Sequence, residues 1–415
     1  MRNRRPVIQA VSLPRGAAGG PRLQLPLNMA LLGCTPGALG VFRGLAFAII
    51  GCGSVAGRIA LLFTRLGVGR LVLVDPKNYR NGSLATHEVG PEDVGQPKAL
   101  ALARRCKAIN PALHVQVFVG PVEELELAAL ADVDLVVMSP DNLPAEMTAG
   151  QYALWLQKPL AQASVHGPTL TVQIRFFGTA SGNGGCPACG YGRAELEMMS
   201  KEAVFSCEGA RGPAASSPDS TPATNSISAA CSLAADLAVI MIARFVLNLG
   251  QPVENTMLEF NGFTGRTVLS PLGLDPKCPL EHRAFTRTTL VSPLPELSLA
   301  QMVQRATGGP VLANAQFEVA GLDWVEFAAC GCAQPTPVRR FVARGRTQLG
   351  RCPKCAEPFA PLRFYTHRLA SASVLGSAVE RPLLKLGARR VSSVLLRTGD
   401  HGVLIRQQTP TQAAS

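Results

Sequence analysis

The sequence predicts an α/β protein with a doubly wound, mostly parallel sheet, followed by a smaller C-terminal α+β domain. Three observations predict this fold class. Short apolar runs alternate with helical patterns over residues 45–138, the first apolar run ends in glycines, and the composition changes near residue 285 to short elements with paired cysteines. Strands that alternate with helices are typical of a parallel sheet covered by helices on both faces.

The first half of the chain supplies the expected sheet. Residues 45–53 (LAFAIIGCG) predict a central strand buried on both faces, because the run is apolar without alternation. We then expect helices over 55–66, 97–109 and 123–130, and strands over 71–75, 115–119 and 135–138. Ligands of such sheets bind beyond the carboxyl ends of the strands, where Gly51, Asp75 and Asp141 fall.

The later segments complete the expected organisation. We expect strands over 169–177, 256–260 and 266–269, a mobile loop over 207–225, an apolar helix over 227–247 and a final hairpin over 391–407. The expected domains are a basic N-terminal arm (1–43), a domain of residues 44–284 and a basic C-terminal domain (285–415). Because the apolar helix contains Asp236 and Arg244, we expect it in a protein core and not in a membrane.

The composition excludes several classes of protein. The chain has 415 residues, of which 47% are hydrophobic, so it is not a disordered chain, and its formal net charge is +12. Residues 1–43 hold six arginines and no acid, and residues 338–406 hold 14 basic and 3 acidic residues. We interpret these basic ends as docking surfaces, and we expect their partner to be an acidic protein rather than a nucleic acid. Twelve cysteines without a secretory signal predict reduced thiols and a cytoplasmic location.

A glycine turn connects the first expected strand to the first expected helix. The sequence Gly51-Cys-Gly53-Ser54-Val-Ala56 has the spacing of a Rossmann-like turn, in which the backbone approaches a phosphate at a helix N-terminus. Asp75 follows Gly53 by 22 residues, where an acid can bind ribose hydroxyls. This spacing suits a NAD-dependent oxidoreductase and an adenylating enzyme equally well. A tight turn without a ligand is the alternative.

Two further positions favour a triphosphate. Lys98 stands in the first turn of an expected helix, where a positive side chain is unfavourable unless an anion binds there. The alternative is an exposed lysine. Asp141 and Asn142 follow a buried strand. A carboxylate that faces phosphate groups requires Mg²⁺ between the carboxylate and the phosphates. We therefore predict a site for a nucleoside triphosphate and Mg²⁺ at this edge of the sheet.

These segments together resemble the ThiF/MoeB class of ubiquitin-activating-type (E1-like) adenylyltransferases. The likeness rests on GCGSVAGRIALLFTRLGVGRLVLVD, GQPKALALARRCKAINP, DLVVMSPDN and CPAC, in this order, over about residues 45–285. It implies ATP- and Mg²⁺-dependent adenylation of the C-terminal carboxylate of a ubiquitin-like protein. It also implies phosphate contacts for Gly51, Gly53 and Lys98, a ribose contact for Asp75 and orientation of Mg²⁺ by Asp141, with Ser54 and Asn142 in the same cofactor site.

The chain departs from the family pattern after the second strand. The family usually has Asp-X-Asp and then Asn-Leu-X-Arg-Gln, whereas this chain has Asp75-Pro-Lys77 and carries Ser83 and Thr86 at the Asn and Arg positions. Arg80 can replace the missing contacts, and so can an arm arginine of a dimer mate. The arm arginines considered are Arg2, Arg4, Arg5 and Arg15. If neither does, adenylation is impaired and the protein is a non-catalytic scaffold.

One cysteine group predicts a zinc ribbon from its spacing alone. Cys330-X-Cys332 is followed after 19 residues by Cys352-X-X-Cys355, a pattern typical of tetrahedral zinc. Four thiolates leave no position for water, so we expect a structural role.

A second cysteine group is incomplete by itself. Cys186-X-X-Cys189 needs two more ligands, and the resemblance implies that Cys278 and His282 supply them, with histidine in place of the family's cysteine. The alternative is that His282 is an ordinary surface histidine and another group completes the zinc shell.

A cysteine outside both groups, Cys207, is the expected nucleophile. Cys207 opens the mobile loop, and the resemblance implies that a cysteine there forms a thioester or persulfide with the activated carboxylate. Cys231 lies in an apolar helical run and is expected in the core. The sequence thus predicts a homodimeric activating enzyme that loads a ubiquitin-like carrier onto Cys207 and passes it to a conjugating enzyme. A sulfur-carrier-protein adenylyltransferase of cofactor biosynthesis is the alternative.

Overall fold

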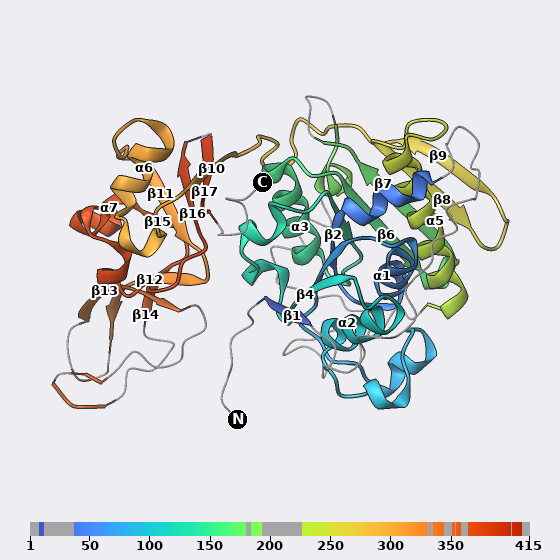
Figure 1. Ribbon diagram of the computed structural model, residues 1–415, viewed down its shortest axis with the longest axis horizontal. Coiled ribbons are helices and arrows are strands. Elements are labelled where there is room, and N and C mark those ends of the chain that lie inside the picture. Colours follow the sequence, from blue (N-terminus) through green and yellow to red (C-terminus); the bar gives the residue numbers. More distant parts are fainter. Residues whose placement is uncertain are drawn as a thin grey trace. The chain divides into compact units, whose positions relative to one another are not determined.

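The structure is a computed structural model of the full chain. It describes residues 8–11, 37–179, 184–192, 226–329, 332, 335–343, 351–352, 354–357, 364–399 and 401–408. The chain divides into two compact units (Figure 1). The first comprises Met1–Leu125 and Asp132–His282, and the second comprises Glu126–Ala131 and Arg283–Ser415.

The first unit is built on a sheet of nine strands in the order β1-β4-β3-β2-β5-β6-β7-β8-β9. Its five parallel strands are β4 (His114–Phe118), β3 (Arg70–Val74), β2 (Ala46–Ile50), β5 (Leu135–Met138) and β6 (Leu160–His166). The antiparallel strands are β1 (Gln9–Val11), β7 (Thr171–Phe177), β8 (Thr256–Asn261) and β9 (Thr267–Pro271). Strand order reverses between β2 and β5, which makes their carboxyl ends the switch point of a doubly wound sheet.

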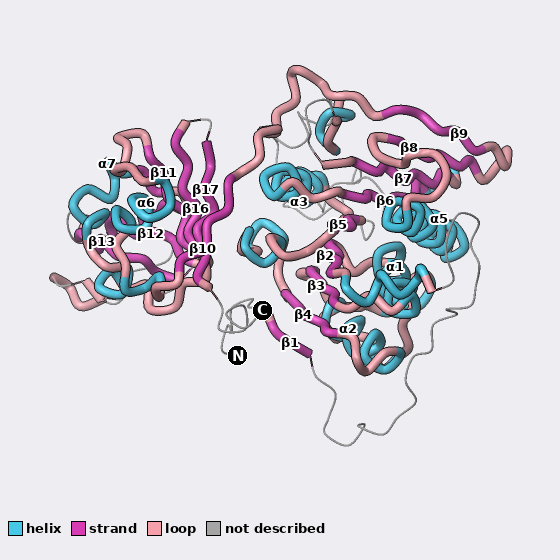
Figure 2. The backbone as a smooth tube through the Cα atoms, turned by 45° about the horizontal axis from the view of Figure 1, so that its top comes forward, coloured by secondary structure: helices cyan, strands magenta, loops and turns pink. Residues whose placement is uncertain are grey.

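Helices cover both faces of this sheet (Figure 2). α1 (Ser54–Leu66), α2 (Lys98–Ile109) and α5 (Ser228–Leu247) pack on one face, and α3 (Leu143–Leu156) lies on the other. All five residues of β2 are buried, as its uninterrupted apolar run predicts. In the core, the ring of Phe47 in β2 lies 4.7 Å from that of Phe63 in α1. The predicted α/β fold with a mostly parallel central sheet is confirmed.

Among the described residues, α5 is the one helix whose length and apolar composition would suit a membrane span. The same properties suit a core helix, and α5 packs on α1, β6 and β7. Its acidic residue Asp236 accepts hydrogen bonds from Arg58 of α1, at 3.1 Å from Nε and 3.3 Å from Nη2. These bonds to Asp236 raise the pKa of Arg58. Asp236, one of the two charged residues that favour a core helix in the sequence, therefore links α5 to α1.

The structure differs from the predictions in several elements. The helix expected over 123–130 is wrong, because extended residues at 125 and 126 separate η4 (Val122–Glu124) from η5 (Leu127–Leu130). Sequence analysis also missed α3 and β6 entirely. The basic arm, for which no elements were predicted, contributes β1 to the sheet edge and most of η1 (Ala38–Gly44) to the core, where Phe42 is fully buried.

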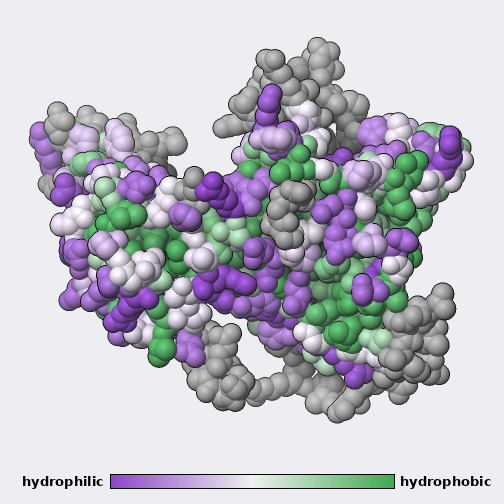
Figure 3. Space-filling model, turned by 90° about the horizontal axis from the view of Figure 1, so that it is seen from above, coloured by the Kyte–Doolittle hydropathy of each residue, from purple (hydrophilic) through white to green (hydrophobic). Residues whose placement is uncertain are grey.

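The sheet of the first unit ends in an apolar edge strand. β9 pairs with β8, and no further strand follows it among the described residues. Val268 and Leu269 of β9 and Phe263 of the β8–β9 turn are exposed. Figure 3 shows hydrophobic residues (green) among hydrophilic ones (purple) on the face that it draws.

The second unit contains two smaller sheets. The five-stranded sheet has the order β10 (Thr286–Leu290), β17 (His401–Gln407), β16 (Ser393–Thr398), β11 (Ala315–Val319) and β15 (Ala370–Ser371). The three-stranded sheet has the order β13 (Thr336–Ala343), β12 (Leu322–Ala328) and β14 (Phe364–His367). The predicted hairpin is confirmed as antiparallel β16 and β17. α6 (Leu299–Thr307) and α7 (Ala372–Leu375) complete the α+β unit, whose core holds Phe317 and Trp324.

Short 3-10 helices connect these elements. They are η2 (Asn81–Ala85), η3 (Pro91–Asp93), η6 (Gly167–Thr169) and η7 (Pro187–Gly190) in the first unit, and η8 (Leu294–Glu296), η10 (Gly376–Glu380) and η11 (Leu383–Leu386) in the second.

Candidate functional site

A cavity of about 730 Å³ opens at the carboxyl ends of β2, β3 and β5 in the first unit. Its size lies in the range of small-molecule sites. Residues 226–228 at the start of α5 and two residues of β6 complete its wall. The structure brings together there all of the residues that sequence analysis places at the nucleotide: Gly51, Gly53, Ser54, Asp75, Lys98, Asp141 and Asn142.

Gly51 is required by the turn that follows β2. Its φ is +84°, in the left-handed region that favours glycine. A Cβ at this position would lie 2.9 Å from the backbone oxygen of Ser139, which follows β5. The glycine therefore lets the β2 and β5 loops approach each other at the switch point, and both loops line the cavity.

Helix N-termini surround the cavity. Gly53, Pro97 and Ile227 precede α1, α2 and α5, and none of these three helices has a side-chain cap or an acidic first turn in the described part of the chain. The first N–H groups of a helix have no acceptor within the helix and carry positive partial charge. α3 differs, because the Asn142 side chain accepts a hydrogen bond from the Ala145 N–H at 2.9 Å. The uncapped ends favour an anion in the cavity.

The Asp75 carboxylate is buried beside the cavity, with 5% of the residue exposed. One oxygen accepts the Cys52 N–H at 2.7 Å and the other accepts the Lys77 N–H at 2.7 Å. Burial raises the pKa of Asp75, and the positive charge of Lys98 opposes that shift. Asp75 therefore holds the glycine turn and the β3 loop together. Each oxygen keeps a lone pair that a ribose hydroxyl could use.

Lys98 is the first residue of α2 and is as buried as Asp75. Its N–H donates to the Lys77 carbonyl oxygen at 2.9 Å, and its Nζ lies 5.8 Å from the centre of the Tyr79 ring. A buried ammonium at an uncapped helix N-terminus adds to the positive potential there. This arrangement is suited to a polyanion such as a triphosphate.

Asp141 has a partner that the sequence did not predict. The Lys77 Nζ after β3 forms an ion pair with Asp141 Oδ2 after β5. We tested whether the cavity carboxylates suit Mg²⁺. The two oxygens of Asp75 already accept N–H bonds, the Asp141 charge is neutralised by an ammonium, and Glu123 is the remaining carboxylate among the described lining residues. This donor set does not fit a divalent cation as it stands.

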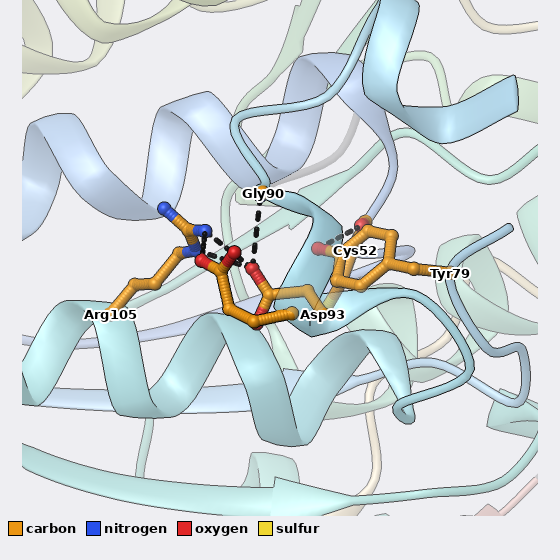
Figure 4. Close-up of polar contacts among 6 residues, drawn as sticks. Cys52, Tyr79, Gly90, Asp93 and Arg105 are labelled. Atoms are coloured by element: carbon orange, nitrogen blue, oxygen red, sulfur yellow. Dashed lines mark hydrogen bonds and ion pairs between the residues drawn. The ribbon is translucent and has the colours of Figure 1, made fainter. Parts of the chain in front are cut away.

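The loop of residues 78–97, which carries Arg80 and leads into α2, is held by hydrogen bonds. Figure 4 shows these contacts. Arg105 of α2 donates to Asp93 from Nε at 3.0 Å and from Nη2, and Asp93 is buried. At the other end of residues 78–97, the Tyr79 hydroxyl points to the Cys52 carbonyl oxygen of the glycine turn at 3.5 Å. The loop is thus held at both α2 and the turn.

The positions that depart from the family pattern also lie at the cavity. Ser83 is 4% exposed, and its Oγ accepts the Arg80 N–H at 3.1 Å. Arg80, Thr86 and His87 line the cavity beside it. Of the arginines considered as replacements, Arg80 therefore reaches the site, whereas the arm arginines lie outside the described residues.

Four predicted zinc ligands of the first unit lie together. The Sγ atoms of Cys186 and Cys189 are 3.7 Å apart, those of Cys186 and Cys278 are 3.5 Å apart, and His282 Nε2 lies 3.5 Å from Cys189 Sγ. Tetrahedral zinc with Zn–S bonds of about 2.3 Å and Zn–N bonds of about 2.0 Å gives ligand separations of about 3.8 Å and 3.5 Å. The donor set and its spacing fit Zn²⁺. Burial lowers the pKa of His282, which favours the neutral form that binds metal.

A second cysteine cluster lies in the second unit. Cys332, Cys352 and Cys355 are grouped, with 3.7 Å between the Sγ atoms of Cys332 and Cys352. The Ala356 N–H donates to the Cys352 carbonyl oxygen at 2.9 Å, which closes the turn of the Cys-X-X-Cys pair. Cys330, the fourth predicted ligand, lies outside the described residues. The three described thiols fit one face of a zinc tetrahedron.

Among the described cysteines, Cys231 lines the cavity. Cys207 and the loop over 207–225 lie outside the described residues. Cys231 was expected in the core, and it is buried, but it also lines the cavity. The sequence held one signal for this position. Cys231 stands near the start of α5, and α5 begins at the edge of the sheet where ligands bind. His87 and Glu123 are further cavity residues that no motif marked.

Comparison with known proteins identifies related sequences for the first unit. The model of the ThiF family matches residues 38–280. A sulfur carrier protein adenylyltransferase of Thermus thermophilus is 31% identical over 28% of this chain and 44% of its own length. Ubiquitin-like modifier-activating enzyme 5 of Dictyostelium discoideum is 26% identical over 35% of this chain and 42% of its own length. The chain thus spans less than half the length of these curated relatives.

Two solved structures also match part of this chain. A crystal structure of E. coli MccB with ATP has 16% sequence identity and a TM-score of 0.46, and covers 59% of this chain and 68% of that chain. A crystal structure of PaaA has 15% identity and a TM-score of 0.44, and covers 57% of this chain.

Proposed function

The chain belongs to the ThiF family, and from this premise we propose that it is an ATP-dependent adenylyltransferase that activates the C-terminal carboxylate of a ubiquitin-like carrier protein. The observation that carries the proposal is the cavity at the switch point, where uncapped helix N-termini, Lys98 and Arg80 converge. The curated relatives named above are adenylyltransferases or activating enzymes for such carriers.

The chemistry explains why the site needs this charge. A carboxylate must attack the α-phosphate of ATP, and the bond between the α- and β-phosphates breaks to release pyrophosphate, so two anionic groups have to approach each other. Fixed donors that stabilise the developing charge and hold an in-line geometry supply most of the rate of such reactions. The buried Lys98 and the α1 N–H groups are fixed donors of this kind, because packing and backbone hydrogen bonds hold them.

We expect isothermal titration to show ATP binding with a dissociation constant of roughly 1–100 µM and no binding of NAD⁺. Lys98→Met should weaken ATP binding about 10- to 100-fold, because it removes a charge-assisted contact while keeping a side chain of similar length. Lys385→Met is the matched control, since Lys385 is exposed in the second unit. Binding of NAD⁺ without ATP would favour the oxidoreductase hypothesis instead.

For the next step we propose transfer of the carrier to Cys207 as a thioester, followed by hand-over to a conjugating enzyme. A second unit of this size favours conjugation over sulfur transfer. The name of the Thermus thermophilus relative supports the alternative, a sulfur-carrier adenylyltransferase, whose carrier adenylate would become a thiocarboxylate when sulfur from a separate donor displaces AMP. The mass of the carrier product distinguishes the two.

Cys207→Ala should keep ATP–pyrophosphate exchange with a carrier that ends in glycine and should abolish any carrier adduct that thiols can reverse. The reason is that adenylation precedes thioester formation and does not need the thiol. Cys231→Ala is the control, because Cys231 also reaches the cavity. If the adduct persists in Cys207→Ala and disappears in Cys231→Ala, the nucleophile is Cys231. Non-reducing gels of the reaction would show either result.

We further propose zinc at both cysteine clusters, a homodimer and a cytoplasmic location. The zinc proposal rests on the donor sets and distances given above. The dimer proposal rests on the family resemblance, and the location rests on the twelve cysteines of the sequence.

A further inference from the structure

An ion pair occupies the part of the cavity where a metal would be expected. Lys77 and Asp141 join the loops after β3 and β5, on either side of the glycine turn that follows β2. Their side chains are 20% and 22% exposed, so water only partly screens their charges. The pair is therefore an electrostatic feature of the binding site and not a surface contact.

Lys77 is held in place from both sides. Its N–H donates to Asp75 Oδ1 at 2.7 Å, and its carbonyl oxygen accepts the Lys98 N–H at 2.9 Å. Both neighbours line the same cavity. The Lys77 backbone is thus fixed by the two groups expected at the ribose and the phosphates, and its ammonium is directed across the switch point to Asp141.

An ammonium at this position competes with a divalent cation. A cation that bound to Asp141 would have to displace Lys77 or accept a like charge within a few ångströms, and both options weaken metal binding. Asp75 compensates little, because both of its oxygens already accept N–H bonds and the lone pairs that they keep are the ones expected to bind ribose hydroxyls. Phosphate oxygens, in contrast, can accept hydrogen bonds from the same ammonium.

We propose that Lys77 supplies the positive charge that a divalent cation would otherwise supply beside Asp141, so that ATP binds to this cavity with little dependence on Mg²⁺. The inference rests on the proposed function, because it takes ATP as the ligand. It names Lys77 as a residue that sets the metal requirement of the site.

The test compares ATP affinity with excess MgCl₂ and with EDTA by isothermal titration. For the wild-type chain we expect the two dissociation constants to agree within about threefold, whereas Lys77→Asp should lose more than about 30-fold in EDTA, because two carboxylates then face the phosphates without a cation. Lys385→Asp changes the net charge equally, on an exposed residue of the second unit, and should behave as wild type.

A second readout does not depend on ATP. Mn²⁺ titrated into nucleotide-free protein and followed by electron paramagnetic resonance should show no site of micromolar affinity in wild type and a new one in Lys77→Asp. If circular dichroism shows that Lys77→Asp does not fold, Lys77→Met takes its place, since it removes the ammonium from beside Asp141 without adding a carboxylate.

The outcomes separate the two hypotheses. If wild type loses affinity in EDTA as strongly as the Lys77 variant, the inference is overturned while the proposed function stands. If the wild-type chain binds ATP in neither condition, the proposed function fails.

Discussion

Replacing Gly51 with alanine should lower the free energy of unfolding of the first unit by about 2–4 kcal/mol. Two costs add. The left-handed φ of +84° is unfavourable for a residue with a Cβ, and that Cβ would lie 2.9 Å from the Ser139 carbonyl oxygen, where backbone cannot move aside easily. Chemical denaturation can be followed through Trp155 of α3, in a Trp324→Phe background that removes the other tryptophan, which lies in the second unit.

Gly53→Ala is the matched comparison, because the two glycines belong to one turn. Gly53 has a φ of −78°, and a Cβ there would meet nothing within 4 Å. Stability should therefore change by less than about 0.5 kcal/mol, whereas ATP affinity should fall about tenfold because the added methyl group enters the cavity. Equal stability of Gly51→Ala and wild type would show that the turn does not need the conformation described here.

Four of the five parallel strands, β2 to β5, could be predicted because each of them is a local signal, whereas β6 was missed. The apolar run that forms β2 is uninterrupted, and the turn after it carries two glycines. Parallel strands place their carboxyl ends at one edge, so Asp75 and Asp141 could be assigned to one site without knowledge of any contact. Both residues line the cavity.

Other features depend on contacts that no local pattern contains. α3 was missed because its buried residues, which include Met147, Tyr152 and Leu154, lie on more than one side of the helix. The ion pair between Lys77 and Asp141 joins residues 64 positions apart and requires the strand order to be known. β10 pairs in parallel with β17, which follows it by more than 100 residues in the chain. Composition cannot indicate such a pairing.

The cysteines show two limits of prediction from sequence, one for distant metal ligands and one for residues that line a cavity. The Cys-X-X-Cys spacing at Cys186 is local, but its partners follow about 90 residues later, and only the resemblance pointed to them. Cys231 was assigned to the core from the apolar pattern of its helix. That pattern does not distinguish a helix end that faces a cavity from one that faces packed side chains.

Removing the zinc ligands of the first unit should have the largest effect on stability. We expect two zinc ions per wild-type chain, one for each cluster, and one in the double variant Cys186→Ser/Cys278→Ser. The free energy of unfolding of the first unit should fall by more than about 3 kcal/mol, because structural zinc contributes its binding energy to folding. Mass spectrometry for metal content and thermal unfolding of the full chain measure both effects.

Two controls assign the loss to the metal. His282→Cys replaces one ligand type with another and should keep two zinc ions, since Zn²⁺ accepts either donor. Cys106→Ser alters a thiol that is fully buried in α2 outside both clusters, so it should reduce stability without changing zinc content. Two zinc ions in the double variant would contradict the site, because the ion would then bind without Cys186 and Cys278. In a second double variant, Cys352→Ser/Cys355→Ser, the remaining zinc should instead be the one in the first unit, and the thermal transition of that unit should not shift.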